Sequence, residues 1–118
     1  MVRKFKPKNI IEIGTWIGST TYFLARGLFD NDNKDSKLYT YDLNNKCLIN
    51  DESLLNYIVL NSNNYAHNLM KNLNVHIDMV FLDANLDKIT CLELLKHCNK
   101  DTIFITHDFV PFVDKGCT

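Results

Sequence analysis

The sequence lacks the features that mark several broad classes of protein. No apolar run is long enough to cross a bilayer, and the first residues lack the apolar core of a signal peptide. Thirteen basic residues against fourteen acidic ones give a net charge of −1, which offers no general attraction to nucleic acid or to an acidic membrane. The four cysteines show neither a paired zinc-binding spacing nor a disulfide framework. We therefore expect a cytoplasmic protein that binds neither nucleic acid nor a membrane.

The length of the chain limits it to a single domain. Its 118 residues can bury one hydrophobic core, and we expect one domain over residues 1–118. Basic residues gather only at the start, as Arg3, Lys4, Lys6 and Lys8. We interpret residues 1–8 as a solvated basic arm rather than as a phosphate-binding patch.

The most informative stretch runs from Asn9 to Thr21. Residues Asn9–Ile13 contain a β-branched run that is typical of a buried parallel strand, and the run stops at Gly14. A second glycine, Gly18, opens a helical pattern that we expect to continue to Phe29. The residues expected on the buried face of this helix are Thr21, Leu24, Ala25 and Leu28.

A glycine turn between a strand and a helix suits the binding of a small ligand. Glycine lets the backbone turn sharply and pass close to a ligand without a Cβ clash. The free N–H groups at the helix start, near Gly18 and Ser19, favour a phosphate or a carboxylate. Glu12 favours the carboxylate, because an acid two residues before Gly14 repels a pyrophosphate but can bind an ammonium group through water. We therefore expect a ligand that carries a zwitterionic amino-acid group.

These residues resemble a known sequence motif. Glu12, Gly14, Gly18 and Ser19 resemble the first motif of class I S-adenosylmethionine-dependent methyltransferases. Trp16 stands where that motif usually has its middle glycine. An aromatic residue at this place resembles the O-methyltransferase branch that includes catechol O-methyltransferase. The resemblance implies a cofactor site formed by Glu12, Gly14, Thr15, Trp16, Gly18 and Ser19. Taken alone, two glycines four residues apart also fit an ordinary strand-to-helix turn.

The rest of the chain alternates between expected strands and helices. Further strands are expected over Leu38–Tyr41, Tyr57–Leu60, Ile77–Leu82 and Thr102–Thr106. Helices are expected over Leu48–Leu55, Tyr65–Leu73 and Leu86–Cys98. The residues of the last helix that we expect to face inward are Ile89, Leu92 and Leu95, with Leu94 as a further candidate. We therefore expect an α/β, Rossmann-like three-layer sandwich with a mainly parallel five-stranded sheet, in the order 3-2-1-4-5, and helices on both faces.

Polar residues follow the second and third expected strands. An acid at the carboxyl end of the second strand of a βαβ unit is placed to bind a ribose diol, which gives Asp42 that role. Asn44 and Asn45 come soon after it, so an ordinary turn is the alternative. After the third strand, the resemblance implies that Ser62 and Asn63 contact the adenine, although a strand-ending turn explains them equally well.

Acids also follow the fourth and fifth expected strands. Asp83 is expected to face the same crevice as the glycine turn. Asp83 and Asp108 match the aspartates that bind a divalent cation in metal-dependent O-methyltransferases, and such oxygen ligands suit magnesium. Phe109 stands where that family has an amide ligand, and Leu86 where it has a lysine, with Lys88 two residues further on. These departures count against a metal.

His107 is a candidate base for the acceptor hydroxyl, as an alternative to a metal ion. An imidazole that titrates near neutrality can take a proton from a hydroxyl if it points into the site. Alternation along the strand allows His107 to be buried against a helix instead. The candidate catalytic residues are therefore His107, Asp108 and Asp83.

The resemblance covers Asn9–Phe109 and implies methyl transfer from S-adenosylmethionine to a hydroxyl of a small molecule or sugar. Three alternatives stay open: a nicotinamide-dependent oxidoreductase, a phosphate-binding module, and an inactive or truncated remnant that binds the cofactor or a partner chain. Glu12 and the lack of a third glycine count against the first two. Family members continue with a further helix and two strands. We therefore expect a truncated form, a partner chain or second copy that covers the fifth strand, or an exposed strand edge.

Overall fold

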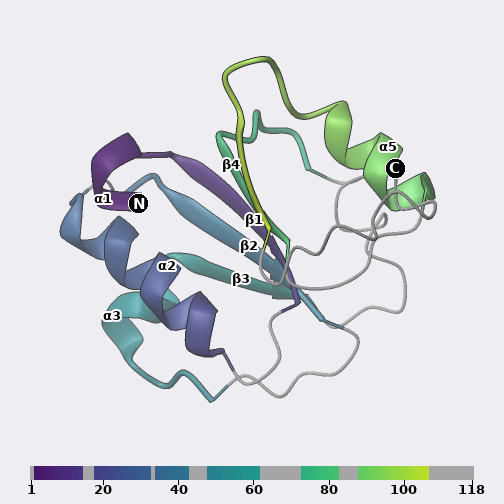
Figure 1. Cartoon of the computed structure of the whole chain (residues 1–118). Coiled ribbons are helices and arrows are strands. Elements are labelled where there is room, and N and C mark those ends of the chain that lie inside the picture. Colours follow the sequence, from purple (N-terminus) through teal and green to yellow (C-terminus); the bar gives the residue numbers. More distant parts are fainter. Residues whose placement is uncertain are drawn as a thin grey trace.

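The computed structural model describes residues 2–14, 18–32, 34–42, 48–61, 73–82 and 88–106. In these ranges five strands form one sheet in the order β3-β2-β1-β4-β5, and every neighbouring pair is parallel (Figure 1). The strands are β1 Asn9–Ile13, β2 Lys37–Tyr41, β3 Ile58–Asn61, β4 Met79–Leu82 and β5 Ile103–Thr106. The helices are α1 Val2–Phe5, α2 Ser19–Asp30, α3 Glu52–Leu55 and α5 Lys88–Leu95. None of these helices is long and apolar enough to cross a membrane. The expected order of the sheet is confirmed.

Helices cover both faces of the sheet. Figure 1 shows α2 and α3 on one face and α5 on the other. The first core packs against α1, α2 and α3 and contains Val2, Ile10, Leu24, Ala25, Leu28, Leu38, Leu54, Tyr57 and Met79. The second core packs against α5 and contains Ile11, Ile13, Tyr41, Ile77, Val80 and Leu94. The expected three-layer arrangement is therefore confirmed.

The central strand, β1, is buried along its whole length. Successive side chains of a strand point to opposite faces, so Ile10 packs in the first core, whereas Ile11 and Ile13 pack in the second. A strand that is buried on both faces has a continuous apolar run rather than alternation. This explains why the β-branched run predicts both the strand and its bounds.

α2 presents the buried face that the sequence predicts. The buried residues of the expected face are Thr21, Leu24, Ala25 and Leu28. Gly27 lies where α1 approaches this helix, and a Cβ atom at Gly27 would stand 2.6 Å from the Cβ of Val2. Glycine at this position therefore allows α1 and α2 to pack closely.

The first residues differ from the solvated arm that the sequence suggests. Val2–Phe5 form α1, and Val2 is 5% exposed because it packs in the first core. Arg3 forms an ion pair with Asp30 at the end of α2, in which the Arg3 Nε donates to Oδ2 at 2.8 Å. The two apolar residues of α1, Val2 and Phe5, are too few to give a periodic signal, and only Val2 is buried. The packing of Val2 in the first core, close to Gly27, and the ion pair of Arg3 with Asp30 make this segment part of the fold.

The buried face of α5 also differs from the expected one. Ile89, Leu92 and Leu95 are 59%, 52% and 51% exposed, so the prediction that they face inward is wrong. Leu94 is 1% exposed and packs in the second core. Apolar side chains occur on several sides of this helix, so their spacing does not select one face. Contact with the sheet makes that selection.

Two other expected helices, Leu48–Leu55 and Tyr65–Leu73, agree only in part with the described elements or lie mostly outside them. α3 covers only the second half of the expected Leu48–Leu55, because Asp51 caps it and its Oδ1 accepts a hydrogen bond from the Ser53 backbone N–H at 3.0 Å. The expected helix Tyr65–Leu73 lies outside the described residues, apart from its last residue, which is not helical.

Candidate functional site

A glycine follows the end of β1, and a second glycine precedes the start of α2. Gly14 and Gly18 have φ angles of 106° and 97°, which residues with a Cβ rarely adopt. Gly18 is the N-cap of α2 and has a left-handed conformation. Thr15 and Trp16, which the sequence also assigns to the site, lie outside the described residues. Glycine at positions 14 and 18 therefore suits the backbone conformation that the structure has at each of them.

The start of α2 provides backbone N–H groups beside this turn. The Gly18 carbonyl accepts a hydrogen bond from the Tyr22 N–H at 2.7 Å, so regular helical bonding starts immediately. Gly18 supplies no side-chain cap, and Ser19, the first helical residue, is exposed. The first N–H groups of a helix have no intrahelical partner and lie at the positive end of the helix dipole. They can therefore bind a negatively charged group.

Asp42 lies beside the glycine turn. Ile13 pairs with Tyr41 in the parallel register, so Gly14 and Asp42 are the next residues of two neighbouring strands. The Gly14 N–H donates to the Tyr41 carbonyl at 2.7 Å and ties the turn to the end of β2. Asp42 is half-buried. The structure thus brings together two predicted site residues from different strands.

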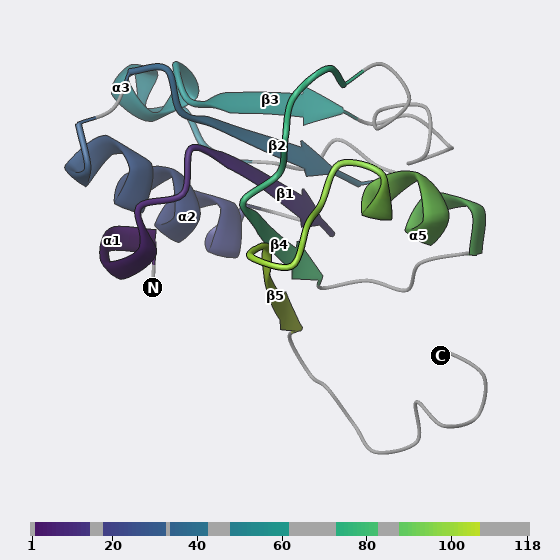
Figure 2. The ribbon, with the colours of Figure 1, turned by 90° about the horizontal axis from the view of Figure 1, so that it is seen from above.

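All five strands end at one edge of the sheet, here called the carboxyl edge. Their last residues pair as Ile13 with Tyr41, Tyr41 with Asn61, Ile13 with Leu82, and Leu82 with Thr106. Figure 2 shows the five arrows pointing the same way. The predicted site residues that follow these ends in sequence but lie outside the described residues are Ser62, Asn63, Asp83, His107 and Asp108. Their roles stay predictions.

Glu12 lies inside the protein rather than on its surface. The side chain is fully buried, and its Oε1 accepts hydrogen bonds from the hydroxyls of Thr21 and Thr40, the latter at 2.7 Å. One carboxylate oxygen therefore joins β1 to both α2 and β2. Both contacts of Oε1 are with hydroxyls of this chain. A contact between Glu12 and the ammonium group of a ligand stays a prediction.

Thr21 and Thr40 are residues of the site region that sequence reasoning missed. Thr21 is predicted only as a member of the buried face of α2. Thr40 pairs with Glu12 in the register of β1 and β2, so the two side chains lie on the same face of the sheet. A buried acid in an apolar strand needs hydroxyl or amide donors from its neighbours, and this requirement is the signal that points to Thr40.

The described residues contain no candidate metal site. No group of three or more histidine, cysteine, aspartate or glutamate side chains among them could hold an ion. The proposed ligands Asp83 and Asp108 lie outside the described residues. The magnesium prediction therefore depends on the sequence alone at this point.

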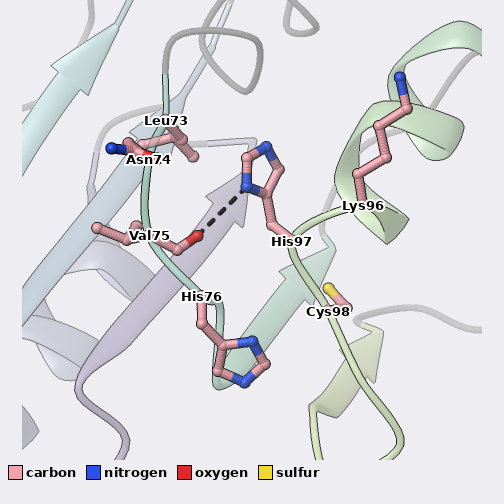
Figure 3. A pocket seen from close by; sticks show the side chains of 7 residues that line it. All are labelled: Leu73, Asn74, Val75, His76, Lys96, His97 and Cys98. Carbon is pink, nitrogen blue, oxygen red and sulfur yellow. Dashed lines mark hydrogen bonds between the residues drawn. The ribbon is translucent and has the colours of Figure 1, made fainter.

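A separate hollow lies near the amino ends of the strands. Its volume is about 350 Å³, and it is lined by Leu73, Asn74, Val75, His76, Lys96, His97 and Cys98 (Figure 3). The His97 ring points toward the Val75 backbone, with Nδ1 3.2 Å from the carbonyl oxygen. Burial raises the pKa of the Cys98 thiol, which favours its protonated form. The lining residues precede β4 or follow α5, so this hollow is not part of the candidate site.

The fold and the site define a class of protein. A parallel sheet in this order, with a glycine turn after β1 and an acid after β2, is the arrangement expected for a Rossmann-like methyltransferase domain. A family model described as a methyltransferase domain matches residues 11–109. The chain therefore belongs to the methyltransferase domain family, and the resemblance found in the sequence is confirmed. No curated protein matches the chain.

Solved structures with a similar fold include two O-methyltransferases and CmcI. The O-methyltransferase TomG from Streptomyces achromogenes, in complex with S-adenosylmethionine, is 25% identical with a TM-score of 0.64, and the match covers 83% of this chain and 47% of TomG. An O-methyltransferase from Bacillus cereus in complex with S-adenosylhomocysteine is 22% identical, with a TM-score of 0.70 and coverage of 89% and 51%. CmcI with Mg-SAM is 20% identical, with a TM-score of 0.75 and coverage of 98% and 51%. The chain thus spans about half the length of these proteins.

Proposed function

We propose that this chain binds S-adenosylmethionine at the carboxyl edge of the sheet and transfers its methyl group to a hydroxyl of a small molecule or sugar. The observation that carries the proposal is the hydrogen bond from Gly14 to Tyr41, which holds the glycine turn directly beside Asp42. The family match supports a methyltransferase, and it favours this reading over the nicotinamide-dependent oxidoreductase. TomG and the Bacillus cereus enzyme, which are O-methyltransferases, support the hydroxyl as the acceptor.

The described residues fit the two ends of such a cofactor. The uncapped start of α2, at Gly18 and Ser19, suits the carboxylate of the methionine part. The half-buried Asp42 carboxylate suits the two ribose hydroxyls, because one carboxylate can accept hydrogen bonds from both. Gly14 has no Cβ, so the backbone can pass close to the ligand between these two points.

The bound cofactor supplies a methyl group that is activated by the positive sulfonium. The chain's own contribution is then to hold the donor and orient the acceptor, because alignment provides much of the acceleration in such transfers. His107 is the proposed residue that accepts the proton from the acceptor hydroxyl, Asp83 is proposed to face the same crevice as the glycine turn, and Asp108 is proposed to act with Asp83 through a bound cation. These three roles rest on the sequence, since the residues lie outside the described ranges.

A divalent cation such as magnesium is a further part of the proposal. Asp83 and Asp108 are the proposed ligands, and the structure of CmcI with Mg-SAM supports a metal in a protein of the same fold. Phe109 and Leu86, which stand at positions where the metal-dependent family has an amide and a lysine, count against it. Metal dependence of methyl transfer, measured with and without a chelator, separates the two cases.

A second candidate function is binding of the cofactor or of a partner chain without turnover. β5 lies at one edge of the sheet that the structure describes, and Phe104 in this strand is 46% exposed. A second copy or a partner chain at this edge is therefore also proposed.

We further propose that the protein works in the cytoplasm on a small-molecule acceptor, and that it has no nucleic-acid or membrane partner.

The test is a calorimetric titration of the chain with S-adenosylhomocysteine and, separately, with NAD. We expect binding of S-adenosylhomocysteine alone, and we expect Asp42→Ala to weaken it by about tenfold, the value of one charge-assisted hydrogen-bond pair. Asp101→Ala, which removes an exposed acid near the amino end of β5, is the matched control and should leave the affinity unchanged. Preference for NAD, or equal affinity of wild type and Asp42→Ala, would contradict the proposal.

Turnover is measured on the same protein. Formation of S-adenosylhomocysteine from S-adenosylmethionine, in the presence of a panel of phenols and sugars, supports the enzyme. Binding without turnover on any panel member supports the remnant. A gain of turnover at higher protein concentration supports assembly of copies as a condition for activity.

A further inference from the structure

Three buried polar side chains, each from a different element, meet near the end of β1. Glu12 comes from β1, Thr40 from β2 and Thr21 from α2, and none of the three is exposed at all. The Glu12 Oε1 accepts hydrogen bonds from both threonine hydroxyls, with 2.7 Å to the Thr40 Oγ1. We call these residues the Thr–Glu–Thr cluster.

Packing alone does not explain the Thr–Glu–Thr cluster. A buried carboxylate is costly to remove from water, and apolar residues of similar volume often fill such a space with equal or greater stability. The neighbouring positions on this face, Ile10, Leu38 and Leu24, are apolar and belong to the first core. Three polar groups in such a core therefore call for a role that directional hydrogen bonds can perform and apolar contacts cannot.

The positions of the three residues indicate that role. Glu12 is two residues before Gly14, Thr40 is two residues before Asp42, and Thr21 lies in the first turn of α2. β2 and α2 are thus both hydrogen-bonded to the Glu12 carboxylate of β1, and each bond lies close to the residues of the proposed cofactor site. The Gly14–Tyr41 hydrogen bond adds a second link between the first two elements.

We infer that Thr21 and Thr40 are positioning residues, which act through Glu12 to fix the start of α2 relative to the ends of β1 and β2. The inference rests on the proposed function. The carboxylate-binding start of α2 and the ribose-binding Asp42 must stand at one fixed separation to hold the two ends of a single molecule. Apolar contacts allow a helix to shift over a sheet, whereas two hydrogen bonds to one oxygen define its place.

The experiment compares valine variants that keep the volume and remove the hydroxyl. Affinity for S-adenosylhomocysteine is measured by calorimetry on Thr21→Val and Thr40→Val, at a temperature well below unfolding, and each melting temperature is recorded. Thr102→Val is the matched control, because the Thr102 Oγ1 donates to the Ile77 carbonyl at 2.8 Å at the opposite end of the sheet. We expect about a tenfold loss of affinity for the two site variants and a change of less than about twofold for the control.

Serine variants test whether the hydroxyl itself is responsible. Thr21→Ser and Thr40→Ser remove a methyl group and keep the donor, so we expect affinity to return to within about threefold of wild type. The double variant Thr21→Val/Thr40→Val should lose less than the sum of the single losses, because both hydroxyls act through one oxygen. If a valine variant does not fold, the same comparison is made between the serine and alanine variants.

The outcomes distinguish failure of the proposed function from failure of the positioning role. If wild type does not bind S-adenosylhomocysteine, the proposed function and this inference both fail. If wild type binds, and the site variants lose melting temperature like Thr102→Val but keep their affinity, the proposed function stands and the positioning role is overturned. If the valine and serine variants lose affinity equally, the hydroxyls do not act as proposed.

Discussion

The two ends of the sheet use similar polar residues for different purposes. At the carboxyl edge, Gly14 and Asp42 present a backbone turn and a half-buried carboxylate. At the amino ends of the strands, Asp78 uses its Oδ2 to accept the backbone N–H groups of Lys8 and Asn9, each at 3.0 Å. At the amino end the aspartate thus accepts hydrogen bonds from the backbone, whereas at the carboxyl edge the aspartate follows a strand at the proposed cofactor site.

The amino end is held by further hydrogen bonds between segments that are distant in sequence. The Asn9 Nδ2 donates to the His76 carbonyl at 3.0 Å, and the Ile77 N–H donates to the His97 carbonyl at 2.8 Å. His76 also lies beside Asp78, with 3.6 Å between Nε2 and Oδ1. The two acids differ in their position relative to a strand, because Asp78 comes before β4 and Asp42, the proposed ribose ligand, comes after β2. The predictions below test the separation of stability at one end from binding at the other.

The largest effect is expected at Gly14. Gly14→Ala places a Cβ at a φ of 106°, which costs about 1–3 kcal/mol of strain. Relief of this strain shifts the backbone beside the proposed cofactor, and the Cβ occupies space where the backbone passes close to it, so affinity for S-adenosylhomocysteine should fall by about tenfold to a hundredfold. Gly27→Ala is the matched control, since its Cβ would stand 2.6 Å from the Val2 Cβ and cost stability without touching the site. Calorimetry and thermal unfolding measure both variants. Equal loss of affinity in the two would remove the distinction between the turn and the rest of the fold.

Asp78 tests the amino end. Asp78→Ala leaves two backbone N–H groups without their acceptor, and the side chain is 34% exposed, so we expect a loss of about 1 kcal/mol in the free energy of unfolding. Affinity for S-adenosylhomocysteine should stay unchanged. Asp78→Asn, which keeps one acceptor oxygen, should lose less in urea unfolding. A drop in affinity with unchanged stability would show that this acid belongs to the binding machinery.

The smallest effect concerns the thiols of α5 and the hollow. Burial raises the pKa of Cys98, so its thiolate forms only at higher pH, and alkylation by iodoacetamide should stay slow at pH 7 and accelerate as pH rises. Cys91 is exposed and should react faster at each pH, because access is not limiting. Peptide mass spectrometry after timed alkylation follows each cysteine separately. Faster reaction of Cys98 at neutral pH would contradict the buried position at the amino end.

Much of the fold can be predicted from local patterns. The β-branched run gives β1 with its bounds, and one apolar stripe gives the buried face of α2. The same reasoning gives the wrong buried face for α5, because apolar residues occur on several sides of this helix. Of the four leucine and isoleucine residues that are candidates for its buried face, only Leu94 is buried. Periodicity thus predicts a face only where the opposite face is polar.

The candidate site is predicted less completely. Gly14, Gly18 and Asp42 are found from spacing because each follows or opens an element that the sequence already predicts. Thr40 is missed, because its hydrogen bond to Glu12 joins residues 28 apart and depends on the register of β1 and β2. A strand pairing shifted by one residue would turn Thr40 to the other face.

The sequence by itself determines the glycine turn, the order of strands and helices, and the acids that follow the strands, since these depend on residues a few positions apart. Tertiary structure alone decides that Val2 is buried against Gly27, which face of α5 meets the sheet, and that Glu12 bonds to Thr21 and Thr40. It also places Asp78 against the backbone of Lys8, 70 residues away. The physical reason is that conformational preference and periodicity act within one segment, whereas hydrogen bonds and close packing between segments exist only after the chain has brought them together.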